Sequence, residues 1–421
     1  MSGHRAIGHG LVVRPPSPRA AHLPPLPAAA DLVVVGAGIV GLAHALEAHA
    51  RGYSVLVVER DPRPDGASAR RSGHVAVTTQ DAATLSCALA SRERWLKLGR
   101  EAGFWVKDTG AVVVARSEDE LAVLDDLVAA RDGDALLLDA AQAAERAGLT
   151  TAGADAVDAV VGGAFLPLDL RVEPRDALRA LAAALASRPR ADVAWSTTAL
   201  TFEAGTGRTL VRTSRGEVVA RRVLVAVGPD LDRFFPDEAA RAGLRPDVRQ
   251  VLQVATPGRR HDAAGPAVLG GTSLLRDAAT AHSPALADVR ERLRTSAPEL
   301  LDAGVHLAFT PHAETLLLGE ARRTDADRRD DAGLDRDPER SEVADALLLR
   351  EAEALLGRPV EVRRRWSVPD LVVPRPRRGP FAGTPFVVTD PAPGVTTVTV
   401  ADGLGTTTAL GLAAKVVDGL L

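Results

Sequence analysis

The feature that most constrains this chain is a short apolar run followed at once by three spaced glycines. The run is Leu32–Val35, and the glycines are Gly36, Gly38 and Gly41. An unbroken run of mostly β-branched residues is typical of a strand buried on both faces of a parallel sheet. Gly36 permits a tight turn, Gly38 lets the backbone approach a pyrophosphate, and Gly41 lets a helix pack closely against the strand.

The residues after the glycines complete a βαβ unit. A helical pattern runs from Ile39 to Ala50, and a second apolar run covers 54–58. The crossover should be right-handed. Glu59 follows the second run, 18 residues after Gly41, where an acid accepts hydrogen bonds from a ribose. The unit therefore predicts dinucleotide binding, against the alternative of a glycine-rich turn in an α/β domain without a ligand.

The segment after Glu59 bears on which dinucleotide binds. NAD-binding domains usually continue with further βαβ units, whereas this chain continues with Asp61-Pro62 and a small, polar stretch from Asp65 to His74. Such a stretch suits a backbone that lies against phosphates and a flat ring system. The residues favour FAD, and an NAD(P) dehydrogenase is the alternative.

Further along, strands and helices alternate. We expect helices at 87–98, 118–131, 140–147, 174–186, 284–295 and 341–356, and a last one from about Thr407. Strands are expected at 111–115, 162–169, 251–255, 306–310, 315–319 and 394–400, and an antiparallel meander at 193–200, 209–213 and 217–227. The Asp- and Arg-rich stretch 322–340 is typical of a solvated loop.

Composition excludes several classes of function. The net charge of −4 gives no sign of nucleic-acid or anionic-membrane binding, and no apolar run is long enough for a membrane span. Cys87 is the only cysteine, so a cysteine-based zinc site is excluded, and we expect no metal. Residues 1–30, with six prolines, should be disordered, and the protein should be cytoplasmic.

Several longer segments resemble one flavoprotein superfamily. They are VVVGAGIVGLAHALEAHARGYSVLVVER, GASARRSGHV, VEPRDAL and the closing DGLGTTTALG. From Asp31 to the C-terminus the chain resembles the D-amino-acid-oxidase-like superfamily, which includes glycine oxidase and sarcosine oxidase. SGHVAVTTQD, GFWVKDTGAVVVARSEDELAVL and RRWSVPDL resemble a bacterial branch of it that is associated with phosphonate catabolism.

The resemblance implies a fold and a division into domains. The fold class is α/β, an α+β two-domain flavoprotein. A Rossmann-like FAD-binding domain with a central parallel sheet and a β-meander would be formed by 31–86, 150–245 and 366–421. A substrate-binding domain with an antiparallel sheet would be formed by 87–149 and 246–365.

It also implies cofactor contacts. In the first unit the candidates are Gly36, Ala37, Gly38, Ile39, Gly41, Glu59 and Arg60. The polar stretch adds Ser68, Arg71, Gly73 and His74, and the meander adds Ala199, Ala226 and Gly228. The start of the last helix adds Asp402, Gly403, Leu404, Gly405, Thr406 and Thr407. A positive helix end there would stabilise an anionic reduced flavin. The FAD would be non-covalent, because Cys87 is expected in the core.

The implied reaction is oxidation of a small amine to an imine by hydride transfer to the flavin, with oxygen as acceptor and hydrogen peroxide as product. The substrate would be an amino acid, an N-alkyl amine or an aminoalkylphosphonate. His74 and Arg276 are the candidate catalytic residues, Arg276 as the clamp for an anion. His312, Arg322 and Trp366 are expected to be structural.

The substrate side departs from the superfamily pattern. Its members commonly hold the substrate acid with an arginine and tyrosines, but the only tyrosine is Tyr53, beside the second strand. Asp370 stands where the branch tends to have tyrosine, and Gln253 where an arginine is expected. Two alternatives therefore stay open: a flavin- or NAD-linked dehydrogenase with another electron acceptor, and a flavin-binding protein without amine oxidase activity.

Overall fold

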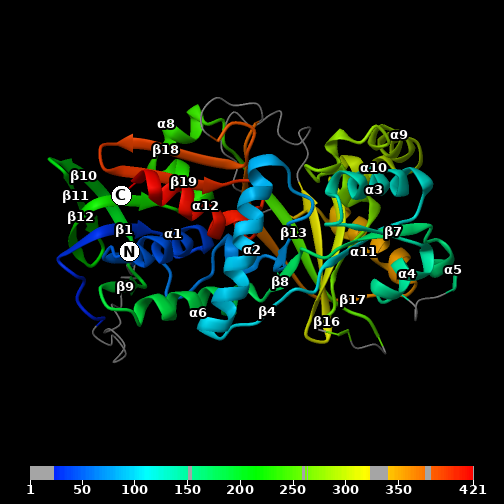
Figure 1. The fold of residues 1–421 in the computed structure, drawn as a ribbon, viewed down its shortest axis with the longest axis horizontal. Helices are drawn as coiled ribbons and strands as arrows, with labels where there is room; N and C mark the ends of the chain where they lie inside the picture. Colours follow the sequence, from blue (N-terminus) through cyan, green and yellow to red (C-terminus); the bar gives the residue numbers. More distant parts are fainter. Residues whose placement is uncertain are drawn as a thin grey trace, which may run out of the picture.

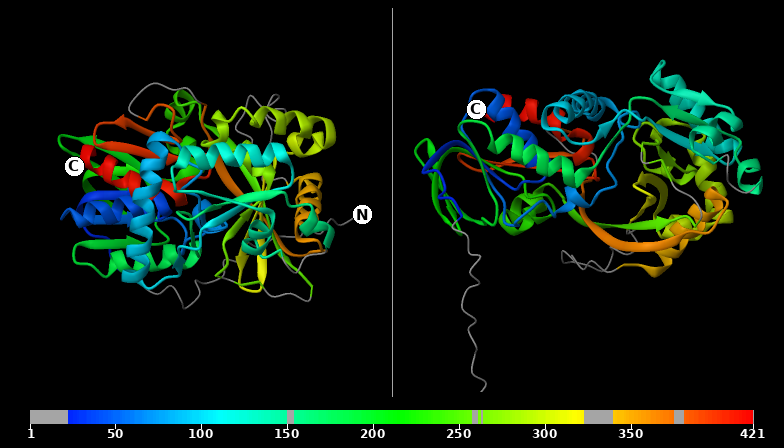
Figure 2. Two further views of the ribbon diagram at one scale, coloured as in Figure 1. Left: turned by 45° about the vertical axis from the view of Figure 1, so that its right-hand side comes forward. Right: turned by 90° about the horizontal axis from the view of Figure 1, so that it is seen from below.

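The computed structural model describes residues 23–149, 154–257, 261–262, 264–322, 340–374 and 381–420. The described strands form two eight-stranded sheets and one small three-stranded sheet. The two large sheets occupy opposite ends of an elongated molecule, and helix α2 (Ala82–Ala102) lies between them in Figure 1. A second direction of view shows the same separation (Figure 2).

The first sheet is centred on β1 (Ala29–Val35), which pairs in parallel with its two neighbours. The strand path is β10 (Ala199–Gly205), β11 (Arg208–Thr213), β12 (Gly216–Val225), β1, β2 (Val55–Val58) and β9 (Ala191–Ala194). β19 (Val395–Val400) pairs with β12 and with β18 (Phe386–Ala392). β10 to β12 form an antiparallel meander. The predicted Rossmann-like sheet is thereby confirmed.

The apolar run of β1 faces two different cores. Leu32 and Val34 pack into a core that includes residues of α1 (Ile39–Ala50), α2, α6 (Pro174–Ala186) and α12 (Gly405–Leu420). Val33 and Val35 pack on the other face, with residues of the meander. Because successive side chains of a strand point to opposite faces, an unbroken apolar run is what such a strand needs.

The second sheet is mostly antiparallel. Its strand order is β17 (Glu361–Val372), β13 (Arg245–Ala255), β16 (Thr315–Arg322), β15 (Val305–His312), β14 (Ala267–Leu269), β5 (Ala111–Ala115), β7 (Gly162–Leu166) and β6 (Leu136–Leu138). Its helices are α3 (Glu118–Arg131), α4 (Ala140–Arg146), α5 (Ala154–Asp158), α9 (Leu286–Ser296), α10 (Pro298–Asp302) and α11 (Glu342–Leu356). Apolar residues from these strands and helices form one core.

The small sheet joins β3 (His74–Val75), β8 (Leu170–Val172) and β4 (Val106–Lys107). The remaining short elements are η1 (Ala67–Arg70), η2 (Gly228–Asp230), α7 (Leu231–Phe234), α8 (Pro236–Arg241), η3 (Gly271–Leu275) and η4 (Thr280–His282). β3 and η1 carry the polar stretch that follows the first βαβ unit.

Strand β17 connects the two halves. Along its length it pairs with β13 of the second sheet. Near its end the carbonyl of Leu371 accepts a hydrogen bond from the amide of Asp402 (2.8 Å), just before α12. The Trp366 indole donates to the carbonyl of Arg70 in η1 (2.9 Å). One strand of the second sheet is thus bonded directly to η1 and to the segment before α12.

Two local predictions were wrong. The stretch 193–200 does not open the meander: β9 pairs in parallel with β2, and the meander begins at Ala199. Ser196, with a left-handed backbone (φ 52°), separates these two strands, which the alternation of side chains does not reveal. Residues 1–30 were predicted to be disordered, but Ala29 and Ala30 already pair with β12. Residues 1–22 lie outside the described residues, as does 323–339 of the predicted charged loop.

The division into two domains stays a proposal, and two elements suggest a revision of its boundaries. Helix α2 packs in the core of the first sheet, where its Trp95 donates to the carbonyl of Thr406 (2.9 Å). β7 pairs with β5 and β6 in the second sheet. We propose that α2 belongs to the cofactor domain and β7 to the substrate domain.

Candidate active site

The turn between β1 and α1 can be built only from glycine at two positions. Gly36 has a left-handed backbone (φ +103°), and a Cβ there would lie 2.6 Å from the carbonyl oxygen of Ala226. A Cβ on Gly41 would lie 1.9 Å from the carbonyl oxygen of Gly36. These distances are far inside van der Waals contact. The close packing that the motif predicted is therefore present.

A groove runs across this turn at the carboxyl end of β1. The N-terminal residue of α1 is preceded by Gly38, which carries no side-chain cap, so backbone N–H groups there are available to an anion. Ser68 lies over the same helix end, where its Oγ accepts from the amide of Ile39 (3.2 Å). The groove is thus shaped to receive phosphate oxygens.

Glu59 closes the groove at the end of β2. Its Oε2 accepts from the amide of Ala37 (2.8 Å) and its Oε1 from the amide of Asp61 (3.0 Å). Each carboxylate oxygen can accept a further hydrogen bond. Glu59 therefore holds the glycine turn in place and can still accept from a ribose hydroxyl, the role expected of it.

Most of the predicted cofactor residues line this groove. They are Gly36, Ala37, Gly38, Ile39, Glu59, Arg60, Ser68, Arg71, Ala199, Ala226, Gly228, Gly403, Gly405 and Thr406. His74, Asp402, Leu404 and Thr407 instead line an adjoining cavity. Gly73 lines neither of these spaces: its backbone is left-handed (φ +81°), and a Cβ would lie 2.0 Å from the carbonyl oxygen of Val172. Glycine is therefore required at this position by packing against β8 and by the backbone conformation.

The residues of the groove fit FAD. Glycines that leave no room for a side chain, a helix end whose N-cap residue is glycine and an acid at the end of β2 form a cradle for the ADP half. Gly403, Gly405 and Thr406 bring the start of α12 to the other end of the groove. Cys87 is buried under α12, where a Cβ on Gly411 would lie 2.1 Å from its carbonyl oxygen, and burial raises the pKa of its thiol. Its position supports non-covalent binding.

The adjoining cavity, of about 490 Å³, lies between the two halves of the molecule. Its walls come from β13, β15, β16, η3, the segment around His74 and the residues before α12. Arg71 lines both the groove and the cavity, so the two spaces meet at this side chain. A ligand in the cavity would therefore lie beside whatever fills that end of the groove.

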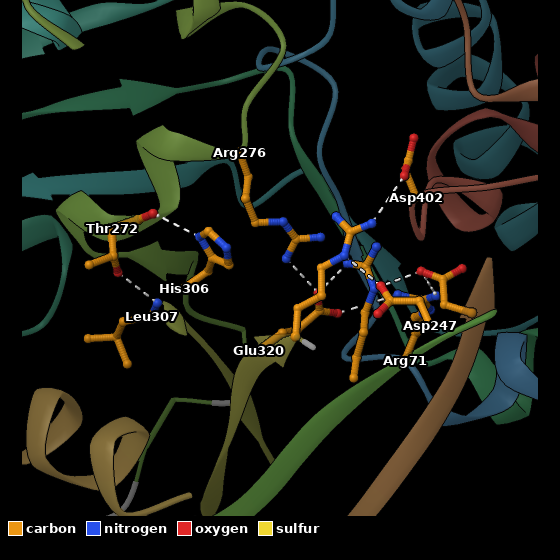
Figure 3. Close-up of polar contacts among 11 residues, drawn as sticks. Arg71, Asp247, Thr272, Arg276, His306, Leu307, Glu320 and Asp402 are labelled. Carbon is orange, nitrogen blue, oxygen red and sulfur yellow. Dashed lines mark hydrogen bonds and ion pairs between the residues drawn. The ribbon is translucent and has the colours of Figure 1, made fainter. Parts of the chain in front are cut away.

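Four arginines line the cavity: Arg71, Arg249, Arg276 and Arg322. Glu320 of β16 binds three of them, Arg249, Arg276 (2.8 Å) and Arg71 (3.4 Å), as Figure 3 shows in part. The other three carboxylates of this network are Asp370, Asp247 and Asp402. Asp370 pairs with Arg249 (2.7 Å) and Arg71 (3.1 Å), and Arg322 pairs with Asp247 (2.5 Å) and Asp402 (3.4 Å). The cavity is thus bordered by a network of four arginines and four carboxylates.

The network shifts the pKa of Glu320 and of Arg276. Burial alone would raise the pKa of Glu320, but Arg249, Arg276 and Arg71 hold it well below its ordinary value. Burial, together with the neighbouring charge of Arg249, lowers the pKa of the Arg276 guanidinium. Arg276 is therefore the cation whose charge is least well compensated, and an incoming anion would gain most there.

The structure places the predicted substrate residues as follows. Arg276 follows η3 and points into the cavity, in contact with Glu320 (Figure 3). Arg322, expected to be structural, also lines the cavity, whereas Trp366 does not and bonds to η1. Gln253 donates to Thr315 (2.9 Å) outside the cavity. The arginine of this strand that reaches the cavity is Arg249, four residues earlier, which had not been predicted.

His74 belongs to a second polar cluster of the same cavity. Its Nε2 lies 2.8 Å from Oδ2 of Asp169, which is fully buried. The cluster also includes Asp277, whose pKa is raised to about 7 by burial. Asp169 and Asp277 had not been predicted, because they come from the turn before β8 and the residue after Arg276, far apart in sequence. Only the proximity of Asp277 to Arg276 could have pointed to it.

No helix in the part of the chain with described structure is long and apolar enough to cross a membrane. The same residues contain no group of three or more His, Cys, Asp or Glu side chains placed to hold a metal ion.

Solved structures with the same fold cover nearly the whole chain. Glycine oxidase from Geobacillus kaustophilus has a TM-score of 0.66 at 17% identity, covering 94% of this chain and 95% of its own. L-proline dehydrogenase from P. horikoshii has a TM-score of 0.67 at 17% identity, covering 93% of each chain. L-α-glycerophosphate oxidase from Mycoplasma pneumoniae with FAD bound has a TM-score of 0.66 at 16% identity, covering 92% of this chain and 94% of its own. No curated protein matches the sequence.

A groove that fits FAD, beside a cavity between two sheets, defines a two-domain flavoprotein. The family model described as FAD dependent oxidoreductase (DAO) matches residues 31–418. The chain therefore belongs to the DAO family of FAD-dependent oxidoreductases, and its cofactor is FAD.

Proposed function

We propose that this protein is an oxidase of a small amine, such as an amino acid, an N-alkyl amine or an aminoalkylphosphonate. The observation that carries the proposal is the cavity that meets the FAD groove at Arg71. It is lined by four guanidinium groups and by His74 and Asp277, with Asp169 buried in contact with His74. A molecule with an anionic end and an amine fits such a division of charge.

The arginines would bind the anionic end. Arg276 offers a fork of donors that suits a carboxylate or a phosphonate. Among the described residues, Nη2 of Arg249 is buried and has no hydrogen-bond partner, which makes it a second donor for the anion. Because Glu320 already binds both arginines, the anion would share them with this carboxylate.

The reaction requires positioning more than acid or base strength. FAD, when bound, accepts a hydride from the carbon that carries the amine, and the imine that results is hydrolysed by water. The chain must hold this C–H bond in place, keep the amine unprotonated and limit the access of water. The arginines position the anion, and the wall that contains His74 and Asp277 is left to bind the nitrogen.

Oxygen is the proposed electron acceptor, and a dehydrogenase with another acceptor is the second candidate. The similar fold of L-proline dehydrogenase motivates that alternative. A flavin-binding protein without amine oxidase activity is the third. Tyr53, the only tyrosine, lines neither the groove nor the cavity, so any substrate would have to be held without a tyrosine.

The test is a screen of purified holoenzyme. We expect a yellow protein with flavin absorbance near ~450 nm. Under anaerobic conditions we expect at least one compound from a panel to bleach this band, and in air the same compound should give hydrogen peroxide. The panel contains glycine, N-methylglycine, the common L- and D-amino acids, and aminomethyl- and 2-aminoethylphosphonate. Bleaching without peroxide would favour the dehydrogenase, and no bleaching at all would contradict the proposal.

The same screen decides the membership of the phosphonate-associated branch. Preference for an aminoalkylphosphonate over the carboxylate of equal chain length would support it. The reverse preference would restrict the proposal to amino acids and N-alkyl amines.

A further inference from the structure

The cavity wall beside His74 contains two buried polar atoms that lack a hydrogen-bond partner in the described chain, Oγ of Ser273 and Oδ2 of Asp277. Both belong to η3 or the residues directly after it. A buried acceptor without a donor is costly, and a ligand that supplies the donor removes that cost. An ammonium group has three such donors. This wall is therefore complementary to an amine nitrogen.

The histidine of this wall is held in one orientation. Oδ1 of Asp169 accepts from the amides of Val77 and Thr78 (2.9 Å each) and from the Thr78 hydroxyl (3.0 Å). Its other oxygen, Oδ2, lies 2.8 Å from Nε2 of His74. Because these donors stabilise Asp169 as a carboxylate, its Oδ2 accepts the hydrogen bond from His74. Nε2 of His74 therefore carries the hydrogen. Nδ1 then has a free lone pair, and no described residue donates to it.

We propose that His74, oriented by Asp169, takes the proton from the ammonium group of the substrate, and that Asp277 holds this nitrogen in place. His74 and Asp277 would be catalytic and binding residues, respectively, and Asp169 a positioning residue. The inference deepens the proposed function and rests on it, because it assigns the second wall of the same cavity.

The proton transfer is balanced within the cavity. One N–H bond of the ammonium breaks, its electron pair stays on nitrogen, and the proton forms a new bond to Nδ1 of His74. The imidazolium that results is stabilised by the Asp169 carboxylate on its other nitrogen. The free electron pair on nitrogen then favours departure of the hydride from the adjacent carbon, because it can form the C=N bond of the imine.

The charges around this wall come from several elements. His74 belongs to β3, Asp169 precedes β8, and Arg276 and Asp277 follow η3. Arg131 of α3 donates to the carbonyls of Thr78 and Gln80 just behind the wall. Burial raises the pKa of Asp277 to about 7 although Arg276 and His74 lower it, and Asp169 raises it further. Asp277 can thus change its protonation state near neutral pH.

The decisive variant is Asp169→Asn. An asparagine keeps the Oδ1 acceptor for Val77 and Thr78 but presents an NH₂ group to His74. The ring would then carry its hydrogen on Nδ1 and could no longer accept a proton there. With the best substrate of the screen, we expect flavin reduction at pH 7 to slow about 100-fold, within the usual range for general-base catalysis. The rates should converge with those of the wild type above the pKa of the free amine.

A matched control is available on the same side of the molecule. His312 pairs with Glu173 (3.2 Å), is 38% exposed and does not line the cavity. His312→Gln should leave the pH profile unchanged, whereas His74→Gln should behave like Asp169→Asn. A parallel loss at every pH in Asp169→Asn and His74→Gln, without convergence, would overturn the proposal, because it would indicate a structural role.

Binding without turnover tests Asp277. 2-Methylalanine has no hydrogen on its α-carbon and cannot be oxidised, and isobutyrate has the same skeleton without the amine. By calorimetry on holoenzyme we expect 2-methylalanine to bind at least tenfold more tightly than isobutyrate. Asp277→Asn should remove most of this ratio and leave the affinity for isobutyrate unchanged. An unchanged ratio would contradict the role of Asp277.

These outcomes separate the two proposals. If no panel compound reduces the flavin, the proposed function fails, and calorimetry still shows whether this wall recognises an amine. If an amine is oxidised but the Asp169→Asn profile stays parallel to the wild type, only the proton-transfer proposal fails.

Discussion

The groove and the cavity are built by different means. In the groove, backbone atoms define the shape: Gly36 and Gly41 leave no room for a Cβ, and the glycine turn, α1 and Glu59 lie close together in sequence. In the cavity, charged side chains define the shape, and they come from β3 and the residues before it, β13, β16, the residues after η3 and the residues before α12. A cofactor that defines the family can be bound by a fixed backbone. A substrate that differs between relatives requires side chains that can be replaced one at a time.

The largest expected effect separates the two regions completely. Gly41→Ala places a Cβ 1.9 Å from the carbonyl oxygen of Gly36, so the turn must open. We expect the purified variant to be colourless and to gain no flavin on reconstitution, as measured by the ratio of flavin to protein absorbance. Gly419→Ala near the end of α12 meets no atom within 4 Å and serves as the control. A yellow Gly41→Ala protein would show that the turn is not needed for FAD.

The next effect concerns the stability of the cavity. Glu320→Gln removes the carboxylate shared by Arg71, Arg249 and Arg276. We expect the free energy of unfolding to fall by about 3 kcal/mol, the lower end for a broken buried ion pair, because the cavity admits solvent. The same variant should bind isobutyrate more tightly, because the Glu320 carboxylate no longer competes with it for the arginines. Denaturant titration and calorimetry measure the two changes. An unchanged free energy of unfolding would mean that the ion-pair network does not stabilise the fold.

A smaller effect depends on pH. In the folded state the pKa of Asp277 is about 7, whereas the ordinary pKa of an aspartate is 3.8. Between these values a rise in pH deprotonates the unfolded state first, so this group lowers stability by up to about 1.4 kcal/mol per pH unit. The difference in unfolding free energy between Asp277→Asn and the wild type should therefore grow in favour of the variant from pH 4 to 7. Asp288→Asn, an exposed change on α9, should show no such trend.

The smallest effect is on substrate affinity alone. Arg276→Lys keeps the charge but loses the fork of donors that fits a planar anion. We expect KM for the best substrate to rise about tenfold, equal to about 1.4 kcal/mol, with the flavin content unchanged. Arg290→Lys, exposed on α9, is the matched control. A loss of flavin in Arg276→Lys would contradict the separation of groove and cavity.

The sequence predicted the groove well because its determinants are local. The strand, the glycines, the helix and Glu59 lie within about thirty residues, and each has a steric or electrostatic reason that can be read from its spacing. The fold class followed, and it is confirmed. The start of the meander was misplaced, because a single left-handed residue, Ser196, separates two strands that look continuous in the alternation.

The cavity was harder to predict because its partners are remote in sequence. Arg276 was proposed, but with 48 arginines in the chain nothing marked Arg249 or Glu320. Asp169 gains its significance from His74, which lies 95 residues away and meets it only through the pairing of β3 with β8. No periodicity or motif records such a contact.

Strand β17 connects the FAD groove to the cavity. It pairs with β13, which carries Arg249, and its end supplies Asp370 and Leu371 to the wall of the FAD groove. A substitution in this strand would displace the cofactor and the arginines in the same movement. Kinetic losses from changes in β17 therefore cannot be assigned to substrate recognition unless the flavin is titrated in the same sample, and attempts to alter specificity are better directed at η3.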